Sequence, residues 1–383
     1  MELVFWISVV GIFYLYFGYP IILLITSKFK KHPPREEAFT PNVSVIIAAY
    51  NEEEVIGQRI ENIMASDYPK DKIEVIVSSD GSTDRTNEIV RTMAYKYGNV
   101  KLVASKERGG KSAALNRAVP KAKGEVLVFT DANSVFEPSS LRVLVKPLSD
   151  EKVGCVAGRK VIYGKDENKE AEEFYWKYEN FLKSRESLIH SCMGADGSIY
   201  ALRKELYCFP DPNRGYADDG MISMYVISKG YRLIYEPKAR AWETSSSSLW
   251  REYRRKIRTL SGGLEWMASL WKLLIPFKSP VWWQLWSHKL LRFIIPFSIL
   301  GIVLSSGFLT FGNAGFTVYH FSFASLLFVY AIGALAILGC KRKLCRICFY
   351  FGYMNFSFLS ALVRFISRKT EVTWEKLGRS DHE

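Results

Sequence analysis

The chain has 383 residues, enough for one sizeable soluble domain with further segments; 48% of them are hydrophobic, and the formal net charge is +13. No nucleic-acid-binding motif accompanies the basic charge, which therefore favours anionic lipids or phosphorylated substrates over nucleic acid. The six cysteines are scattered without a disulfide framework, which indicates a reducing compartment, and the five histidines are too far apart to predict a histidine-ligated metal.

The first predicted element is an uncharged apolar segment at residues 5–25, FWISVVGIFYLYFGYPIILLI. It is long enough to cross the hydrocarbon core of a bilayer as a helix, and it lacks the small-residue cleavage site of a signal peptide. The basic residues that follow it directly are Lys28, Lys30, Lys31 and Arg35. Such residues mark the cytosolic side, so we expect an N-terminal anchor, residues 1–28, and a cytosolic domain, residues 29–275.

Residues 42–133 alternate between short apolar runs and segments with helical spacing. The runs NVSVIIAAYNE, KIEVIVSSDGSTD, NVKLVAS and GEVLVFTDAN predict strands, and the segments between them predict helices. The alternation predicts a Rossmann-like α/β fold, a mostly parallel sheet with helices on both faces, in which ligands bind at the carboxyl ends of strands. The polar residues at those ends are Tyr50, Asn51, Glu52, Asp80, Asp131 and Asn133.

The stretch ERGGKSAALNRA, residues 107–118, resembles a nucleotide-binding P-loop. The P-loop pattern requires a glycine five residues before Gly110, where this chain has Ser105. The stretch also follows the third predicted strand, whereas a P-loop usually follows the first. We therefore reject the P-loop. Lys111, at the start of a helix that points toward the strand ends, remains a candidate ligand of a phosphate, with a solvated lysine as the alternative.

Asp131 and Asn133 stand two residues apart where the fourth predicted strand ends. Two oxygen ligands at this position, completed by diphosphate oxygens and water, suit Mg²⁺ or Mn²⁺. The alternative is a helix cap ahead of the segment SSLRVLV. Ser139 and Ser140 are placed to supply that cap, which favours the metal site.

The C-terminal region, residues 276–383, is again apolar and aromatic. Residues 279–293, SPVWWQLWSHKLLRF, combine tryptophans with basic residues and predict an interfacial helix. Residues 293–311 and 316–340 predict two spans, and the basic sequence KRKLCR returns the chain to the cytosol. The last apolar run, residues 347–362, is short for a span and predicts a re-entrant or surface-lying segment, with a fourth span as the alternative.

Six motifs occur in order along the chain: VSVIIAAYNEE, SSDGSTD, GGKSAALN, VFTDAN, GADGSIYALR and YADDGMISMYVISKGYRLIYEPKARAWE. Together they resemble the family 2 glycosyltransferases, in particular the membrane-embedded branch that includes cellulose, hyaluronan and poly-N-acetylglucosamine synthases. The resemblance covers residues 41–266, and the flanking apolar segments fit the same branch. It implies a GT-A fold, a nucleotide-sugar donor, a divalent cation and inversion at the anomeric carbon.

The resemblance also implies which residues contact the donor. The uridine would be held by Tyr50, Asn51, Glu52 and Asp80. Lys111 would reach the donor diphosphate or sugar. Asp131 and Asn133 correspond to the aspartate-x-aspartate metal motif of the family.

On the acceptor side, the resemblance identifies Asp219, the second acid of ADDG, as the general base. Asp218 beside it would raise the pKa of the acid it approaches, and helix capping is the alternative role of this pair. The loop at residues 194–198, GADGS, corresponds to the acceptor-side loop and contains Gly194 and Asp196.

The chain departs from the family pattern at three places. Asn133 replaces an aspartate of the metal motif, and Ser79 replaces the first aspartate of the uridine motif. The Q-x-x-R-W signature of processive synthases is missing, and the comparable stretch is EYRRKIR, residues 252–258. Its basic residues that are able to neutralise a leaving diphosphate are Arg254, Arg255 and Arg258. Without the tryptophan, processive polymerisation does not follow from the resemblance.

We therefore expect a metal-dependent, inverting glycosyltransferase at the cytosolic face of a cell membrane. Its partners would be a UDP-linked sugar, a growing polysaccharide or lipid-linked glycan, and membrane lipid. Transfer to polyprenyl phosphate is the first alternative, although that branch usually places its spans only after the catalytic domain. An inactive nucleotide-sugar-binding scaffold is the second, and the presence of Asp80, Asp131 and Asp219 together argues against it.

Overall fold

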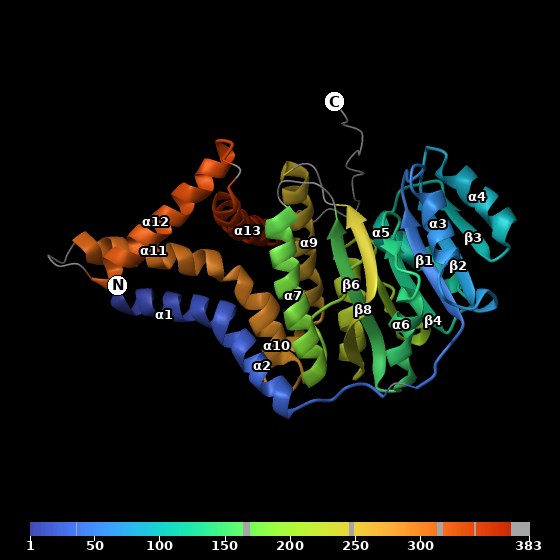
Figure 1. Ribbon diagram of the computed structural model, residues 1–383, viewed down its shortest axis with the longest axis horizontal. Coiled ribbons are helices and arrows are strands. Elements are labelled where there is room, and N and C mark those ends of the chain that lie inside the picture. Colours follow the sequence, from blue (N-terminus) through green and yellow to red (C-terminus); the bar gives the residue numbers. More distant parts are fainter. Residues whose placement is uncertain (36, 164–168, 245–248, 312–316, 341, 369–383) are drawn as a thin grey trace.

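The computed structural model describes the chain except for residues 36, 164–168, 245–248, 312–316, 341 and 369–383 (Figure 1). Within the described residues, eight strands form one sheet in the order β3-β2-β1-β4-β7-β6-β8-β5. The strands are β1 (Val43–Ala49), β2 (Ile73–Asp80), β3 (Val100–Ser105), β4 (Val126–Asp131), β5 (Val135–Phe136), β6 (Val153–Tyr163), β7 (Tyr200–Arg203) and β8 (Arg232–Thr244).

The first four strands form the parallel half of this sheet. β1 pairs in parallel with both β2 and β4, and β2 pairs in parallel with β3. β7 then pairs antiparallel with β4 and β6, β8 runs parallel to β6, and β5 runs antiparallel to β8. The predicted α/β architecture with a mostly parallel sheet is confirmed.

Helices cover both faces of the sheet because successive residues of a buried strand point to opposite sides. In β1, Ile46 belongs to one hydrophobic core, whereas Val45 and Ile47 belong to the other. The helices that contribute to the first core include α5 (Gly110–Ala118) and α8 (Asp218–Ser228). Those that contribute to the second include α3 (Ile56–Met64), α4 (Thr86–Tyr97) and α6 (Ser140–Val145).

The parallel register aligns the carboxyl ends of these strands at one edge of the sheet. Asp131 of β4 lies opposite Ala48 of β1, and Ala49 lies opposite Ser79 of β2. Asp80, the last residue of β2, lies opposite Ser105 of β3. The edge that the sequence predicts as the ligand-binding edge is therefore formed.

One local prediction is wrong, and it concerns the cap of α6. Ser139 occupies the N-cap position, but its side chain makes no capping hydrogen bond. The hydroxyl of Ser140 instead donates to the carbonyl oxygen of Arg240 at 2.8 Å, which ties α6 to β8. The hydroxyl that the sequence pattern predicts as a helix cap is therefore bonded to the strand β8. The cap was the argument that favoured a metal site at Asp131, so the metal hypothesis loses that support.

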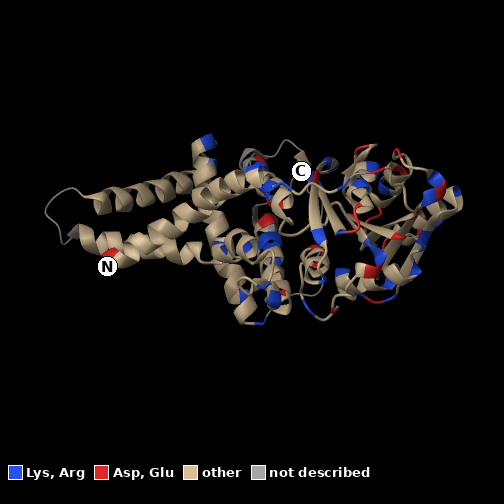
Figure 2. Cartoon of the chain, turned by 90° about the horizontal axis from the view of Figure 1, so that it is seen from below, with Lys and Arg blue, Asp and Glu red and all other residues tan. Residues whose placement is uncertain are grey.

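Two long helices, α7 (Lys169–Ile189) and α9 (Leu249–Ser269), stand between the sheet and a group of apolar helices (Figure 1). The apolar helices are α1 (Glu2–Phe13), α2 (Tyr19–Phe29), α11 (Ile295–Phe311), α12 (Val318–Ile337) and α13 (Lys343–Ile366). α2 packs on α7, and α13 packs on α9. Figure 2 shows that charged residues gather on the sheet and its helices and leave most of the apolar extension without charge.

Among the described helices, Glu2–Phe29 and Val318–Ile337 are long and apolar enough to cross a membrane. Trp282–Phe293 and Ile295–Thr310 add a third candidate if this pair, bent by 55°, forms one span. Glu2–Phe29, Val318–Ile337 and Ile295–Thr310 lie where the sequence predicts spans, whereas Trp282–Phe293 lies where it predicts an interfacial helix. The orientation of these helices stays a prediction. The short run at residues 347–362 belongs to a continuous 24-residue helix, α13, and its path relative to a membrane also stays a prediction.

Candidate active site

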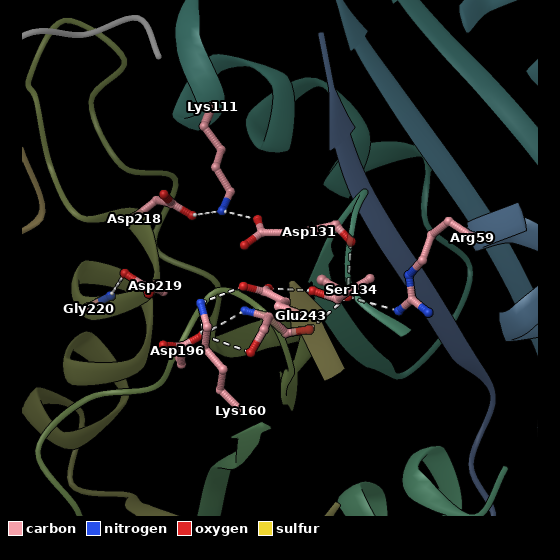
Figure 3. Close-up of polar contacts among 12 residues, drawn as sticks. Arg59, Lys111, Asp131, Ser134, Lys160, Asp196, Asp218, Asp219, Gly220 and Glu243 are labelled. Carbon is pink, nitrogen blue, oxygen red and sulfur yellow. Dashed lines mark hydrogen bonds and ion pairs between the residues drawn. The ribbon is translucent and has the colours of Figure 1, made fainter. Parts of the chain in front are cut away.

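Three aspartates and one lysine converge at the carboxyl edge of the sheet (Figure 3). Lys111 Nζ lies 2.7 Å from Asp131 Oδ1 and 3.5 Å from Asp218 Oδ2. A Cβ atom on Gly197 would lie 3.1 Å from Lys111 Nζ, 3.3 Å from Asp131 Oδ2 and 3.6 Å from Asp219 Oδ2. The α-carbon of Gly197 therefore borders the point of convergence, and a larger side chain at this position would enter it.

Each converging residue comes from the end of an element. Asp131 ends β4, Lys111 lies in the first turn of α5, and Asp218 and Asp219 are the first two residues of α8. The partial positive charge of a helix N-terminus stabilises nearby carboxylates and anionic ligands. The N-cap position of α8 is Ala217, and Asp219 Oδ1 accepts from the backbone nitrogen of Gly220 in the first turn at 2.7 Å, so Asp219 also binds a free N–H group of this helix end (Figure 3).

α9 packs closely against the start of α8, where the two aspartates lie. A Cβ atom on Gly220 would lie 2.5 Å from Nε1 of Trp266, and a Cβ atom on Gly262 would lie 2.4 Å from the backbone nitrogen of Ala217. α8 and α9 therefore approach each other through two glycines that leave no room for side chains. The sequence pattern contains no signal for this contact of Trp266.

The pKa values of the three aspartates diverge. Burial and the neighbouring carboxylate of Asp218 raise the pKa of Asp219 to about 7, against the attraction of Lys111. Burial also raises the pKa of Asp218. Burial opposes the ionisation of Asp131 too, but its shorter ion pair with Lys111 outweighs this effect and lowers its pKa. A carboxyl group with a pKa near neutrality suits a general base at physiological pH.

A second charged cluster lies beside the first (Figure 3). Lys160 Nζ of β6 is 2.5 Å from Glu243 Oε2 of β8 and 4.0 Å from Asp196 Oδ1. Ser134 Oγ donates to Glu243 Oε1 at 2.6 Å. Burial alone would lower the pKa of Lys160, but the carboxylates of Asp196 and Glu243 raise it. We did not predict Lys160 or Glu243 from the sequence, although a lysine and a glutamate in two otherwise buried strands are a usable signal.

The loop with Gly194 and Asp196 connects this cluster to α8. Gly194 has a backbone φ of +101°, a conformation that favours glycine. The backbone nitrogen of Ala195 donates to Ser223 Oγ of α8 at 3.0 Å. Asp196 Oδ1 accepts hydrogen bonds from the backbone nitrogen and the hydroxyl of Ser198, at 3.1 and 2.7 Å. The predicted acceptor-side loop therefore adjoins the predicted base.

Asp80 holds the glycine turn that resembles a P-loop. Its carboxylate is fully buried and accepts from the backbone nitrogens of Gly109 at 3.0 Å and Gly110 at 2.8 Å. Arg117 Nη2 of α5 donates to the same carboxylate at 2.6 Å. Asp80 thus orients the turn that presents Lys111, and its predicted contact with uridine stays a prediction.

The remaining residues of the predicted uridine site lie on the adjacent loop after β1. Asn51 has a backbone φ of +53°, its backbone nitrogen donates to Ser82 Oγ at 3.1 Å, and its Oδ1 accepts from the backbone nitrogen of Thr83 at 2.8 Å.

The two neighbours of Asn51 in the chain also have defined contacts. The guanidinium of Arg108 lies 3.7 Å from the ring centroid of Tyr50. The backbone nitrogen of Glu52 donates at 2.8 Å to Oγ1 of Thr86, the first residue of α4. The structure brings these residues to the same edge as Asp80.

The three arginines predicted to neutralise a diphosphate lie on α9 and differ in their contacts. Arg255 pairs with Glu252, with 2.7 Å between Nη2 and Oε2, and its charge opposes protonation of Lys160. The guanidinium of Arg254 lies 5.3 Å from the ring of Trp250. Arg255 is thus close enough to act on the charge of the second cluster, and the proposed contacts of all three arginines with a diphosphate stay predictions.

Two family descriptions match the chain: "Glycosyl transferase family 2" at residues 44–207 and "Glycosyl transferase family group 2" at residues 126–338. The second match covers more than half of the 383 residues. The chain belongs to the family 2 group of glycosyltransferases. It is therefore a glycosyltransferase by family, and its expected enzyme class is confirmed.

Relatives of this glycosyltransferase agree with that assignment. The probable glycosyltransferase YdaM of Bacillus subtilis is 31% identical over 250 residues, which cover 61% of this chain and 59% of YdaM. A β-monoglucosyldiacylglycerol synthase of Nostoc is 37% identical over 130 residues, covering 33% of this chain and 28% of the synthase. The chain thus matches less than two thirds of the length of these relatives.

A solved structure covers nearly the whole chain. The mannosyltransferase PcManGT from Pyrobaculum calidifontis, in complex with GDP-Man and Mn²⁺, is 26% identical and has a TM-score of 0.73. The alignment covers 96% of this chain and 99% of that one. The mixed, mostly parallel sheet of a GT-A glycosyltransferase is therefore confirmed.

The residues at the convergence point fit a divalent cation. Asp218 Oδ2 is a buried carboxylate oxygen 3.5 Å from the ammonium of Lys111, and this ammonium stands as a cation between Asp218 and Asp131. Asp131 presents hard oxygen atoms at this point, which Mg²⁺ and Mn²⁺ prefer, and the contribution of Asn133 stays a prediction. Among the described residues, no three acidic, histidine or cysteine side chains form a complete metal site, so a bound ion would take further ligands from the substrate.

Proposed function

We propose that this glycosyltransferase moves a sugar from a nucleoside diphosphate sugar to an acceptor hydroxyl, with inversion at the anomeric carbon. The observation that carries the proposal is the convergence of Lys111, Asp131 and Asp219 at Gly197. A cation-binding carboxylate and an acid with a pKa near neutrality meet there, which is what a displacement with a diphosphate leaving group requires.

The proposed reaction is one displacement. The acceptor oxygen forms a bond to the anomeric carbon while the bond from that carbon to the diphosphate breaks, and the diphosphate leaves with the bonding electrons. Asp219 takes the proton of the acceptor hydroxyl. Lys111 lies where it can neutralise the departing charge. A divalent cation held by Asp131 and Asn133 would supply further charge neutralisation.

The donor would bind along the edge formed by the ends of β1 and β2 and by the glycine turn. Asp80 and Arg117 hold this turn, so that the start of α5 and Lys111 face the space in front of Asp131. The backbone nitrogens of Gly109 and Gly110 already donate to Asp80, so Lys111 is the cationic group that this turn would present to a diphosphate. By resemblance we propose UDP as the nucleotide, with Tyr50 and Asn51 beside the base, and GDP is the competitor because PcManGT is solved with GDP-Man.

We propose that the reaction takes place at the cytosolic face of the membrane. The anchor would be residues 1–28, the catalytic domain residues 29–275 and the second membrane region residues 276–383. The apolar helices and the basic residues that follow the first of them support this division. The acceptor would be a growing polysaccharide or a lipid-linked glycan.

The experiment that tests the proposal is a donor screen with the purified full chain in lipid nanodiscs. UDP- and GDP-linked sugars are supplied singly with Mg²⁺ or Mn²⁺, and release of the nucleoside diphosphate is measured. We expect one donor to be turned over and chelator to stop the reaction. Asp219→Asn should retain donor binding and lose turnover, with Asp67→Asn, a substitution of an exposed acid, as a control. Failure of every nucleotide sugar to bind or turn over would refute the proposal.

A further inference from the structure

A groove of about 520 Å³ is lined by residues of α9, α12 and α13, and α13 packs against both of the other helices. The residues that line it are apolar or aromatic and include Trp250, Tyr253, Tyr330, Ala334, Tyr353 and Phe356. Its walls therefore come from the catalytic domain on one side and from a candidate membrane span, α12, on the other.

Two glycines shape the floor of this groove. A Cβ atom on Gly333 of α12 would lie 3.1 Å from backbone atoms of Cys348 and Phe349 on α13. A Cβ atom on Gly352 would lie 3.3 Å from the ring of Tyr330. Since neither glycine carries a side chain, α12 and α13 approach closely and leave the aromatic walls above them.

The aromatic walls are packed against one another. The rings of Tyr253 and Phe356 are stacked, with centroids 5.9 Å apart and planes at 13°. Trp250 stacks on Tyr253 at 5.4 Å. Rings held in this way form an apolar surface that exists before a ligand arrives, which limits the ordering required on binding.

A continuous series of aromatic side chains joins the groove to the catalytic clusters. Tyr353, which lines the groove, lies 5.7 Å from Tyr350, and Tyr350 lies 6.4 Å from Tyr175 of α7. Tyr175 lies 5.7 Å from Trp176. Lys160 Nζ lies 5.7 Å from the ring of Trp176 and 4.0 Å from Asp196 Oδ1. The groove and the acceptor-side loop therefore lie at the two ends of one series of neighbouring aromatic side chains.

We propose that this groove binds the hydrocarbon chain of a lipid acceptor, whose hydroxylated head group extends past Tyr175 and Trp176 to the base Asp219. The proposal rests on the proposed function and names its acceptor class as an amphiphile. An occupant of the groove must be apolar, because the walls offer few polar atoms, and it must be able to enter beside α12. The aromatic faces farther along suit the apolar face of a sugar ring. A lipid with a sugar head group meets all of these conditions.

The test uses methyl, octyl and dodecyl β-glucosides with the full chain in phosphatidylcholine nanodiscs. A glucoside that is glycosylated yields a KM, and one that binds without being glycosylated yields an inhibition constant against hydrolysis of the donor. For each variant, the constant of the methyl compound is divided by that of the dodecyl compound. Because both constants come from the same variant, a general change of its activity does not alter the ratio. We expect the dodecyl compound to bind the wild type at least about tenfold more tightly than the methyl compound, since each buried methylene contributes up to about a fourfold gain.

Ala334→Trp fills the groove and should remove most of this ratio. The matched control is Leu335→Trp, the next residue of α12, which is 44% exposed and does not line the groove. It should retain the wild-type ratio. Phe356→Ser removes one of the aromatic rings of the groove and should also lower the ratio. This variant replaces Ala334→Trp in the test if Ala334→Trp does not fold. An unchanged ratio in both groove variants would overturn the proposal.

Photolabelling separates failure of the groove from failure of the proposed function. A dodecyl glucoside with a diazirine in its chain should label α13 near Tyr353 in the wild type and in Leu335→Trp, and much less in Ala334→Trp. Labelling with this pattern in a protein that turns over no nucleotide sugar would refute the proposed function and retain the lipid site. Turnover without this pattern would refute the lipid site alone.

Discussion

Lys111 and Asp131 form an ion pair of 2.7 Å that joins the start of α5 to the end of β4. The two residues are 20 positions apart in the chain. They meet because β4 lies next to β1 in the sheet and α5 packs against β1 and β2. The ammonium thus stands beside the carboxylate that we propose as a metal ligand, and several predictions on the donor site depend on this relationship.

The first prediction concerns Asp131. Asp131→Ala removes a proposed metal ligand and leaves Lys111 beside Asp218 alone. Donor binding and turnover should both fall, and turnover in the wild type should stop with chelator and return with Mg²⁺ or Mn²⁺. Isothermal titration with UDP or GDP and an initial-rate assay measure the two effects. Asp67→Asn, an exposed acid paired with Arg142, is the matched control. Full activity in chelator would contradict the metal assignment.

The second prediction concerns Lys111 and the resemblance to a P-loop. The glycine turn is tied to Asp80, and the helix that follows it packs behind the sheet edge, so the turn has no place for a triphosphate cradle. A nucleoside diphosphate should bind, and ATP should not displace it. Lys111→Met should weaken binding of the nucleotide by about tenfold or more while the fold persists, because a charge-assisted contact is lost. ATP hydrolysis that disappears in Lys111→Met would reinstate the P-loop.

The third prediction separates the two acids of ADDG. Asp219→Asn keeps the size of the side chain but removes the proton acceptor, so transfer should fall by about 10²–10⁴-fold while donor binding persists. Asp218→Asn should have a smaller effect, because its proposed contribution is to the electrostatics around Lys111 and Asp219. If the order of the two effects were reversed, Asp218 would be the base. If neither substitution mattered, the acceptor would be a group such as a phosphate that needs no base.

The fourth prediction follows from the pKa of Asp219. The base must be ionised, and burial together with Asp218 raises its pKa from 3.8 to about 7. Activity should therefore rise about tenfold per pH unit up to about pH 7 and level off above it. The linkage to stability has the opposite direction: the folded state holds this proton more tightly than the unfolded state, so stability should decrease as pH rises from about 4 to about 7.

Rate profiles and thermal unfolding of metal-free protein at pH 5 and pH 8 measure the two parts of this prediction. Asp219→Asn should be inactive across the range and should lose less stability than the wild type between the two pH values. An activity profile of the wild type that is flat from pH 5 to pH 8 would show that Asp219 is not the base.

The fifth prediction concerns the junction between the domain and the apolar helices. His288 is buried, with Nδ1 2.6 Å from Glu186 Oε1 and Nε2 3.0 Å from Glu179 Oε2. Glu186 also accepts from Tyr19 of α2 at 2.5 Å and from the backbone nitrogen of Met193 at 3.2 Å. The cluster therefore connects α2 to Met193, the residue that directly precedes the acceptor-side loop.

His288→Ala leaves two buried carboxylates with fewer partners and should destabilise the protein by about 3–5 kcal/mol. His288→Gln should be less harmful, because an amide replaces part of the hydrogen bonding. Thermal unfolding in nanodiscs compares both with His32→Ala, whose imidazole is exposed. Equal unfolding temperatures for His288→Ala and His32→Ala would contradict the proposed importance of the cluster.

Orientation in the membrane is a separate prediction. Tyr95 of α4 is 95% exposed on the catalytic domain. A cysteine in its place should resist a membrane-impermeant thiol reagent in intact cells and react after permeabilisation, with the wild type as the background for the six native cysteines. Labelling of intact cells would place the catalytic domain on the opposite side of the membrane.

The sequence by itself determined the sheet and the edge at which we propose that the donor binds. Buried strands rich in valine and isoleucine alternate with helices, and this local pattern leaves few arrangements besides a parallel sheet. Because all parallel strands end at one edge, Asp80 and Asp131 were predicted to meet there from their positions alone. The first apolar helix followed equally from length and composition, which are local properties.

Only the tertiary structure decided which side chains complete the site. Lys160 and Glu243 meet because β6 and β8 are neighbours, although they are far apart in the chain. Trp266 supports the aspartates because α9 returns across α8 at two glycines, and Ser140 bonds to β8 and does not cap its own helix. These contacts depend on distances between elements, which residue spacing along the chain does not encode. The physical reason is that periodicity reports which face of an element is buried, while packing selects what that face meets.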